Sequence, residues 1–267
     1  MYYPSLDGSP QCAPFLTGPG MFPLVVFLHG QCSEDMHYTK WFRLPAGLAR
    51  AGYIVAMPDL TPIGDPWDLG NATYGLVQTV ISWMRTAWSH SDYVLKAPTL
   101  GIIGHSYGAL HAGQLALMIP ATAYVSLGGA WTEWPTGGGL PIMTLPVPKL
   151  LVWGTLDCVA TLPDPTWNNL ALPKHRLVFT DGAHWDYVPP SATTCDPVAG
   201  DCELIDDLTA DFVALFLSKY MPPDGRLYPC PGCDPGQPST TPRGESLDGA
   251  DVLRGWPEQP HELRYGR

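Results

Sequence analysis

Short apolar runs alternate along the chain with longer stretches in which apolar residues recur at wider spacing. Residues 23–29 read Pro-Leu-Val-Val-Phe-Leu-His, a continuous apolar and β-branched run. Such runs are typical of strands that are buried on both faces, as in a parallel sheet. On this pattern the sequence predicts strands at residues 23–29, 53–57, 99–104, 123–127, 150–153 and 176–180.

Between these runs the spacing of three or four residues indicates amphipathic helices. In residues 75–88 the apolar positions are Leu76, Val80, Ile81, Met84 and Trp88. The predicted helices span residues 41–51, 75–88, 107–119 and 204–220. Because strands and helices alternate, the pattern predicts an α/β fold with a mostly parallel central sheet and helices on both faces.

The alternating pattern ends near residue 221. Residues 222–267 are rich in Pro, Gly and charge and poor in aliphatic side chains. Such a segment cannot bury enough apolar surface to offset the entropy lost on ordering. We therefore predict one domain at residues 1–221 and a disordered tail at residues 222–267, whose removal leaves the domain folded.

The net charge and the hydropathy of the chain disfavour nucleic acid and membranes as partners. The chain has 267 residues, of which 45% are apolar and 15% charged, and its formal net charge is −11. An acidic chain is a poor ligand for nucleic acid or for an anionic membrane surface. No run is long and apolar enough to span a membrane, and no signal peptide is visible.

Seven cysteines favour an oxidising compartment. A single Cys-x-x-Cys without a second pair of ligands is a weak signal for zinc, and we predict no metal and no cofactor. We expect two or three disulfides and an exported protein, the alternative being a cytoplasmic one. The cysteines whose spacing suggests disulfides are Cys12 and Cys32, Cys195 and Cys202, and Cys230 and Cys233.

Residues 104–108 carry the strongest chemical signal. They read Gly-His-Ser-Tyr-Gly, where the predicted strand 99–104 passes into the predicted helix 107–119. A sharp turn between strand and helix strains the serine backbone and raises the hydroxyl above the sheet, beside the positive end of the helix dipole. This context favours Ser106 as a nucleophile over an ordinary surface serine.

A serine hydroxyl needs a base to take its proton. His184 follows the predicted strand 176–180, so it lies at the carboxyl edge of the sheet, as Ser106 does. His175 precedes that strand and His261 lies in the tail. The position after the strand therefore favours His184 as the base.

The acid that orients the base comes between the two along the chain. Asp157 follows the predicted strand 150–153, and a buried carboxylate there would hold the imidazole tautomer. Asp164, a few residues further along, is the rival. The position at the strand end favours Asp157.

An oxyanion hole needs two donors beside the nucleophile. The first predicted strand ends at His29-Gly30, and the chain reversal there brings the backbone N–H of Gln31 towards Ser106. We assign the hole to the amides of Gln31 and Tyr107.

These motifs, in this order, resemble the α/β-hydrolase superfamily over residues 23–220. Within it the chain is similar to cutinases and polyester hydrolases, and to esterases related to dienelactone hydrolase and to platelet-activating-factor acetylhydrolase. The resemblance departs from the polyester hydrolases at Tyr107, where they usually have Met, and at Gln31, where they have an aromatic residue. The matching segments are His29-Gly30, Gly-His-Ser-x-Gly at 104–108, Ala130-Trp131, Asp157-Cys158-Val159-Ala160 and Gly182-Ala183-His184.

The resemblance implies that Trp131 and Val159 line the substrate cleft. Trp185 also falls on a loop at the catalytic edge. The Gly- and Pro-rich stretch between residues 127 and 150 contains no amphipathic helix, so we predict an open cleft without a lid.

On this basis the sequence predicts an enzyme, a carboxylic-ester hydrolase that forms an acyl-enzyme intermediate. The open aromatic cleft favours short-chain or aromatic esters as substrates. The resemblance to polyester hydrolases adds polyesters to the substrates to test. Alternatives with the same three residues are a thioesterase, a peptidase or an acyltransferase, because the pocket sets the substrate. A binding protein that has lost catalysis is a further alternative.

Overall fold

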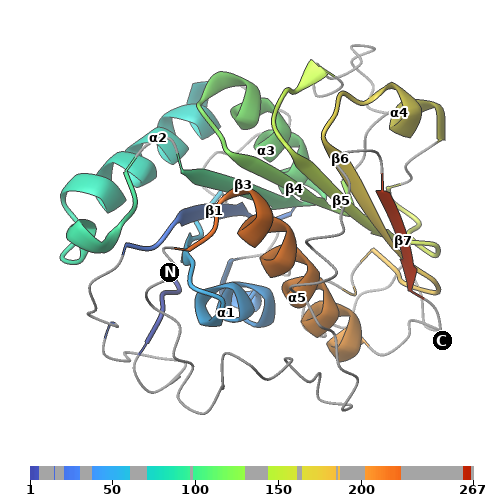
Figure 1. Cartoon of the computed structure of the whole chain (residues 1–267), viewed down its shortest axis with the longest axis horizontal. Helices are drawn as coiled ribbons and strands as arrows, with labels where there is room; N and C mark the ends of the chain where they lie inside the picture. The colour runs from blue at the N-terminus through green and yellow to red at the C-terminus, as the bar shows by residue number, and fades with distance from the viewer. Residues whose placement is uncertain are drawn as a thin grey trace.

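A seven-stranded parallel sheet forms the centre of the computed structural model (Figure 1). The structure describes residues 1–5, 15, 21–30, 38–60, 71–96, 99–129, 144–160, 164–184, 186, 202–223 and 261–265. In these residues the strand order is β2-β1-β3-β4-β5-β6-β7, and every neighbouring pair is parallel. The strands are β1 (Leu24–Leu28), β2 (Ile54–Ala56), β3 (Leu100–His105), β4 (Ala123–Leu127), β5 (Lys149–Gly154), β6 (Lys174–Phe179) and β7 (His261–Tyr265).

Helices cover both faces of the sheet. Helices α1 and α5 pack on one face, and α2 and α3 pack on the other (Figure 1). The α-helices are α1 (Arg43–Arg50), α2 (Asn71–Thr86), α3 (Tyr107–Met118), α4 (Asp164–Asn169) and α5 (Cys202–Tyr220), with short 3₁₀ turns at η2 (Tyr38–Lys40) and η4 (Ser91–Tyr93). None of the helices in the described ranges combines the length and apolarity that a membrane crossing requires.

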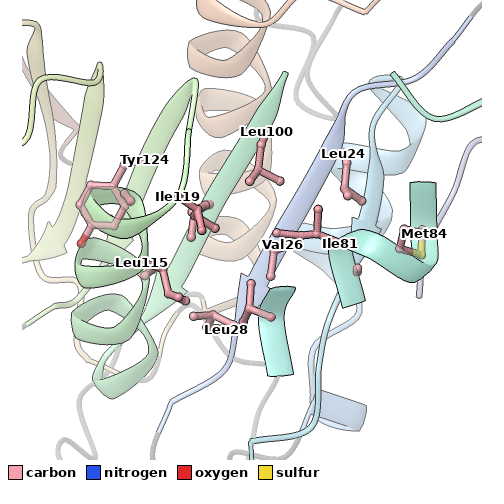
Figure 2. Packing of buried hydrophobic residues seen from close by; sticks show 14 of the residues in the cluster. Leu24, Val26, Leu28, Ile81, Met84, Leu100, Leu115, Ile119 and Tyr124 are labelled. Carbon is pink, nitrogen blue, oxygen red and sulfur yellow. The ribbon is translucent and has the colours of Figure 1, made fainter. Parts of the chain in front are cut away.

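The central strands are apolar throughout because both of their faces are covered. In β1, Leu24, Val26 and Leu28 belong to the cluster under α2 and α3, whereas Val25 and Phe27 belong to the cluster under α1 and α5. All five side chains are buried, with at most 1% exposure. Figure 2 shows the first cluster, where side chains of β1 lie near Ile81 and Met84 of α2, Leu115 of α3, and Ile119, which follows α3.

The predicted strands and helices are present, with ends that shift by up to four residues. Helix α2 begins at Asn71 instead of residue 75, and β6 begins at Lys174 instead of residue 176. The pattern missed α4, whose six residues are too few to show a helical period.

The predicted tail is wrong for residues 261–265. These residues form β7, which pairs with β6 from His175↔His261 to Phe179↔Tyr265. An edge strand is held by backbone hydrogen bonds and needs few apolar side chains, so His-Glu-Leu-Arg-Tyr gave only a weak pattern. The rest of the predicted tail, residues 224–260, lies outside the described residues.

The predicted disulfides stay predictions, and so does export. Cys12, Cys32, Cys195, Cys230 and Cys233 lie outside the described residues. Cys202 begins α5. Cys158, which was not assigned to a pair, is exposed.

Candidate active site

Ser106 occupies a strained turn between β3 and α3. Its φ is 52° and its ψ is −117°, a conformation that L-residues rarely adopt. Its N–H donates to the carbonyl of Leu127 at 2.9 Å, which ties the turn to the end of β4. Strain of this kind persists only where the surroundings enforce it, and it is common at functional sites.

The two glycines of the motif are required by space. A Cβ on Gly104 would collide with the backbone of Gly108, and a Cβ on Gly108 would collide with the carbonyl of Leu28. Strands β1 and β3 and helix α3 therefore meet in backbone contact around Ser106. This close approach explains why small residues stand on both sides of the serine.

Three predicted side chains form one chain of hydrogen bonds. His184 Nε2 lies 2.9 Å from Ser106 Oγ, and His184 Nδ1 lies 3.0 Å and 2.9 Å from the two carboxylate oxygens of Asp157. A carboxylate only accepts, so Nδ1 carries the hydrogen, and Nε2 of the neutral ring accepts from the serine hydroxyl. His184 and Asp157 are buried. This geometry is the one that a neutral His184 needs in order to accept the proton of Ser106.

The backbone also orients the Asp157 carboxylate. The amides of Val159 and Ala160 donate to Oδ1 at 2.9 Å and 2.7 Å. The rival, Asp164, lies at the start of α4. The structure thus brings Asp157 to His184, and the loop after β5 closes around the carboxylate.

Hydrogen bonds join the loop after β5 to the end of β6 and the loop after it. Thr155 N–H donates to Phe179 O at 2.9 Å, Leu156 N–H donates to Gly182 O at 2.9 Å, and Asp181 N–H donates to Thr155 Oγ1 at 2.9 Å. A Cβ on Gly154 would collide with the backbone of Gly182. This contact sets the separation between the loop of Asp157 and the loop of His184.

Sequence reasoning missed three residues that surround His184. Asp186, which is buried, accepts a hydrogen bond from Ala183 N–H at 2.8 Å and fixes the turn. His105, also buried, lies 2.9 Å from the carbonyl of His184 through Nε2. Gly128, with φ of 51°, lies against the Asp157–His184 pair. Gly128 had a local signal, because a glycine after a strand often marks a turn, and His105 stood out only as a member of the serine motif.

His29 holds the chain where it leaves β1. Leu60 N–H donates to His29 Nε2 at 3.0 Å, so Nδ1 carries the hydrogen and donates to Gly30 O at 3.0 Å. The Asp59 carboxylate is 4.0 Å from Nε2, but a nitrogen that accepts from an amide carries no proton, so this contact is not an ion pair. His29 thus connects the end of β1 to the segment that follows β2.

Only part of the predicted hole and cleft falls in the described residues. Tyr107 is the first residue of α3, where helical amides point towards the helix start. Val159, on the loop of Asp157, is 50% exposed. Gln31, Trp131 and Trp185 lie outside the described residues.

Metal ligands do not cluster in the part of the chain that the structure describes. No group of three or more His, Cys, Asp or Glu side chains there is arranged to hold an ion.

Comparison with known proteins adds a family match and two structural neighbours. A family model described as Chlorophyllase matches residues 12–128, which include Ser106 but neither Asp157 nor His184. The comparison with curated proteins gave no match.

Two of the solved structures that match share the fold at low sequence identity. A structure described as an alpha-beta serine hydrolase homologue from Coxiella burnetii is 14% identical, with a TM-score of 0.52, over 73% of this chain and 88% of that one. A ferulic acid esterase from Streptomyces cinnamoneus is 22% identical, with a TM-score of 0.56, over 84% of this chain and 74% of that one. The chain therefore has the α/β-hydrolase fold that the sequence resemblance predicted.

Proposed function

We propose that this protein is a serine hydrolase that cleaves carboxylic esters. The observation that carries the proposal is the continuous hydrogen-bond chain from Ser106 through His184 to Asp157, with Ser106 on a strained turn. Each member is of the residue type that acyl transfer requires, and each is held by its own loop.

The proposed reaction has two steps. As Ser106 Oγ attacks the ester carbonyl, His184 Nε2 takes the hydroxyl proton, and the Asp157 carboxylate stabilises the imidazolium. The tetrahedral oxyanion accepts hydrogen bonds from the Tyr107 and Gln31 amides. His184 then gives its proton to the leaving alcohol, which leaves an acyl-serine. Water, deprotonated by His184, attacks this acyl group and releases the acid and the free serine.

Two further observations bear on the substrate. One structural neighbour is described as a ferulic acid esterase. The loop of Asp157 also presents two exposed apolar side chains, Leu156 at 38% and Val159 at 50% exposure. Exposed apolar side chains on the loop of Asp157 suit a substrate with an apolar acyl or alcohol group better than a charged substrate. We further propose that Trp131 and Trp185 contact the substrate, which favours short-chain or aromatic esters. Polyesters are substrates to assay alongside them.

The experiment compares Ser106→Ala with a matched control, Ser218→Ala on α5, whose hydroxyl donates only to a carbonyl of its own helix. We expect Ser106→Ala to lower kcat on p-nitrophenyl butyrate by about 10⁴-fold or more, because the members of such a triad act as a unit. The control should keep its activity. A fluorophosphonate should label the native enzyme and not Ser106→Ala, as intact mass spectrometry would show.

Three outcomes would point elsewhere. A Ser106→Ala enzyme that keeps more than about a hundredth of kcat would remove Ser106 as the nucleophile. A native protein that is folded but neither labelled nor active would be a binding protein. A preference for the matched thioester or anilide would keep the mechanism and replace the ester by another acyl substrate.

A further inference from the structure

His105 adjoins the nucleophile along the chain and contacts the base in space. It is the last residue of β3, it directly precedes Ser106, and its side chain has no exposed surface. Its Nε2 lies 2.9 Å from the backbone carbonyl of His184. A carbonyl only accepts, so Nε2 carries a hydrogen and donates it. The residue beside Ser106 therefore holds the backbone of the residue that would take the serine proton.

Ring contacts on two sides fix the orientation of His105. Its ring centroid is 4.9 Å from that of His184, at an interplanar angle of 42°. The buried ring of Trp41, which precedes α1, lies 5.0 Å away at 55°. A buried ring in contact with two others has little freedom to leave its hydrogen bond.

The charge of His105 matters because a second cation beside His184 would oppose proton uptake by the base. Burial lowers the pKa of His105 well below its usual value, and the proximity of His184 lowers it further. The hydrogen bond to the His184 carbonyl acts in the opposite direction but is weaker than burial. His105 is therefore neutral at neutral pH, and it donates a hydrogen bond without adding a charge next to the imidazolium.

Asp157 and Asp186 hold His184 at points other than its carbonyl. Asp157 holds only the Nδ1 side of the ring, and Asp186 holds the preceding residue through Ala183 N–H. Neither contact anchors the His184 carbonyl. Proton transfer depends on the 2.9 Å separation between Nε2 and Ser106 Oγ, and misplacement by about 1 Å costs about 100-fold in rate.

We propose that His105 is a positioning residue, whose hydrogen bond to the His184 carbonyl holds the imidazole at the distance from Ser106 that proton transfer requires. This inference rests on the proposed function, because positioning has a catalytic effect only if Ser106 is the nucleophile. The competing interpretation is that His105 only fills the space beside Trp41. The two interpretations differ in whether the N–H donor or the ring is needed.

Two substitutions separate the donor from the ring. The amide nitrogen in His105→Gln is four bonds from Cα, as Nε2 of histidine is, so this variant keeps a donor and loses the ring. His105→Phe keeps a ring of similar shape and loses the donor, which leaves the His184 carbonyl buried without that bond. We expect His105→Phe to lower kcat on p-nitrophenyl butyrate by about 10- to 100-fold, with KM within about threefold of the native value. His105→Gln should recover most of the lost kcat.

A second readout does not depend on turnover. In the native enzyme the proton on His184 Nδ1, shared with Asp157, should give a resolved downfield proton resonance. We expect that resonance to remain in His105→Gln and to broaden or move in His105→Phe. Thermal midpoints of both variants report whether either has lost the fold, and His105→Met, which also lacks a donor, replaces the Phe variant if the latter cannot be purified.

The outcomes are distinguishable. A folded His105→Phe enzyme with native kcat would overturn the inference. Equal losses in His105→Phe and His105→Gln would also overturn it, since the donor would then be irrelevant. If the native protein lacks hydrolysis that depends on Ser106, the proposed function fails instead, and the downfield resonance still tests whether His105 holds His184.

Discussion

Replacing Gly128 by alanine tests how tightly the Asp157–His184 pair is enclosed. Gly128 follows β4 with φ of 51°, and its N–H donates to Val152 O at 2.8 Å. A Cβ there would lie 3.1 Å from Asp157 Oδ2, 3.1 Å from His184 Nδ1 and 3.4 Å from His184 Cε1. The added methyl would thus press on both atoms of the hydrogen bond that orients the base.

Two effects set the size of the response. Alanine in the left-handed region costs about 1–2 kcal/mol, which lowers the free energy of unfolding. The contacts at 3.1 Å require Asp157 and His184 to move by a few tenths of an ångström, because the hydrogen bond of Gly128 to β5 holds its backbone. Since a misplacement of about 1 Å costs about 100-fold in rate, we expect kcat to fall by about tenfold.

Gly52→Ala is the matched control. Gly52 has φ of 93°, follows α1 and donates to Ala49 O at 3.0 Å, so alanine is strained there too. We expect a similar loss in the free energy of unfolding by urea for both variants, and a loss of kcat on p-nitrophenyl butyrate for Gly128→Ala alone. The reasoning is refuted if Gly128→Ala keeps native kcat, or if Gly52→Ala loses as much kcat.

Two further predictions concern the half of the sheet around β5, β6 and β7. A chain ending at Pro260 lacks β7 and leaves the edge of β6 without its partner. We expect its thermal midpoint to lie below that of a chain ending at Tyr265, by about 2–4 °C for each kcal/mol of unfolding free energy lost. Equal midpoints would show that β7 adds no stability. Burial and the charge of Lys174 lower the pKa of Lys149 from 10.5 to about 8. Between about pH 8 and 10.5 the unfolded chain therefore binds more protons at Lys149 than the folded chain does. The free energy of urea unfolding should rise with pH in this window, relative to that of Lys149→Met, on the order of 1–3 kcal/mol. A difference between the two proteins that stays constant with pH would contradict the burial of a charged lysine.

The sequence by itself determined most of the sheet and the type of chemistry. Strands buried on both faces are apolar at every position, and helices repeat every three or four residues, so both patterns are local. The turn at Ser106 was also predictable, because a strand, a Gly-x-Ser-x-Gly motif and a helix follow one another directly along the chain. His184 and Asp157 were predictable as candidates, since in a parallel sheet the residues after the strands share one edge.

Only the tertiary structure decided how these residues meet. The strand-end position favoured Asp157, but its hydrogen bond to His184 is seen only in the structure. The contacts of His105 and Gly128 with His184 join residues more than fifty positions apart. No pattern along the chain encodes such contacts, because they depend on how neighbouring strands are aligned. The same holds for β7: its place beside β6 is set by backbone pairing that any sequence except proline can make.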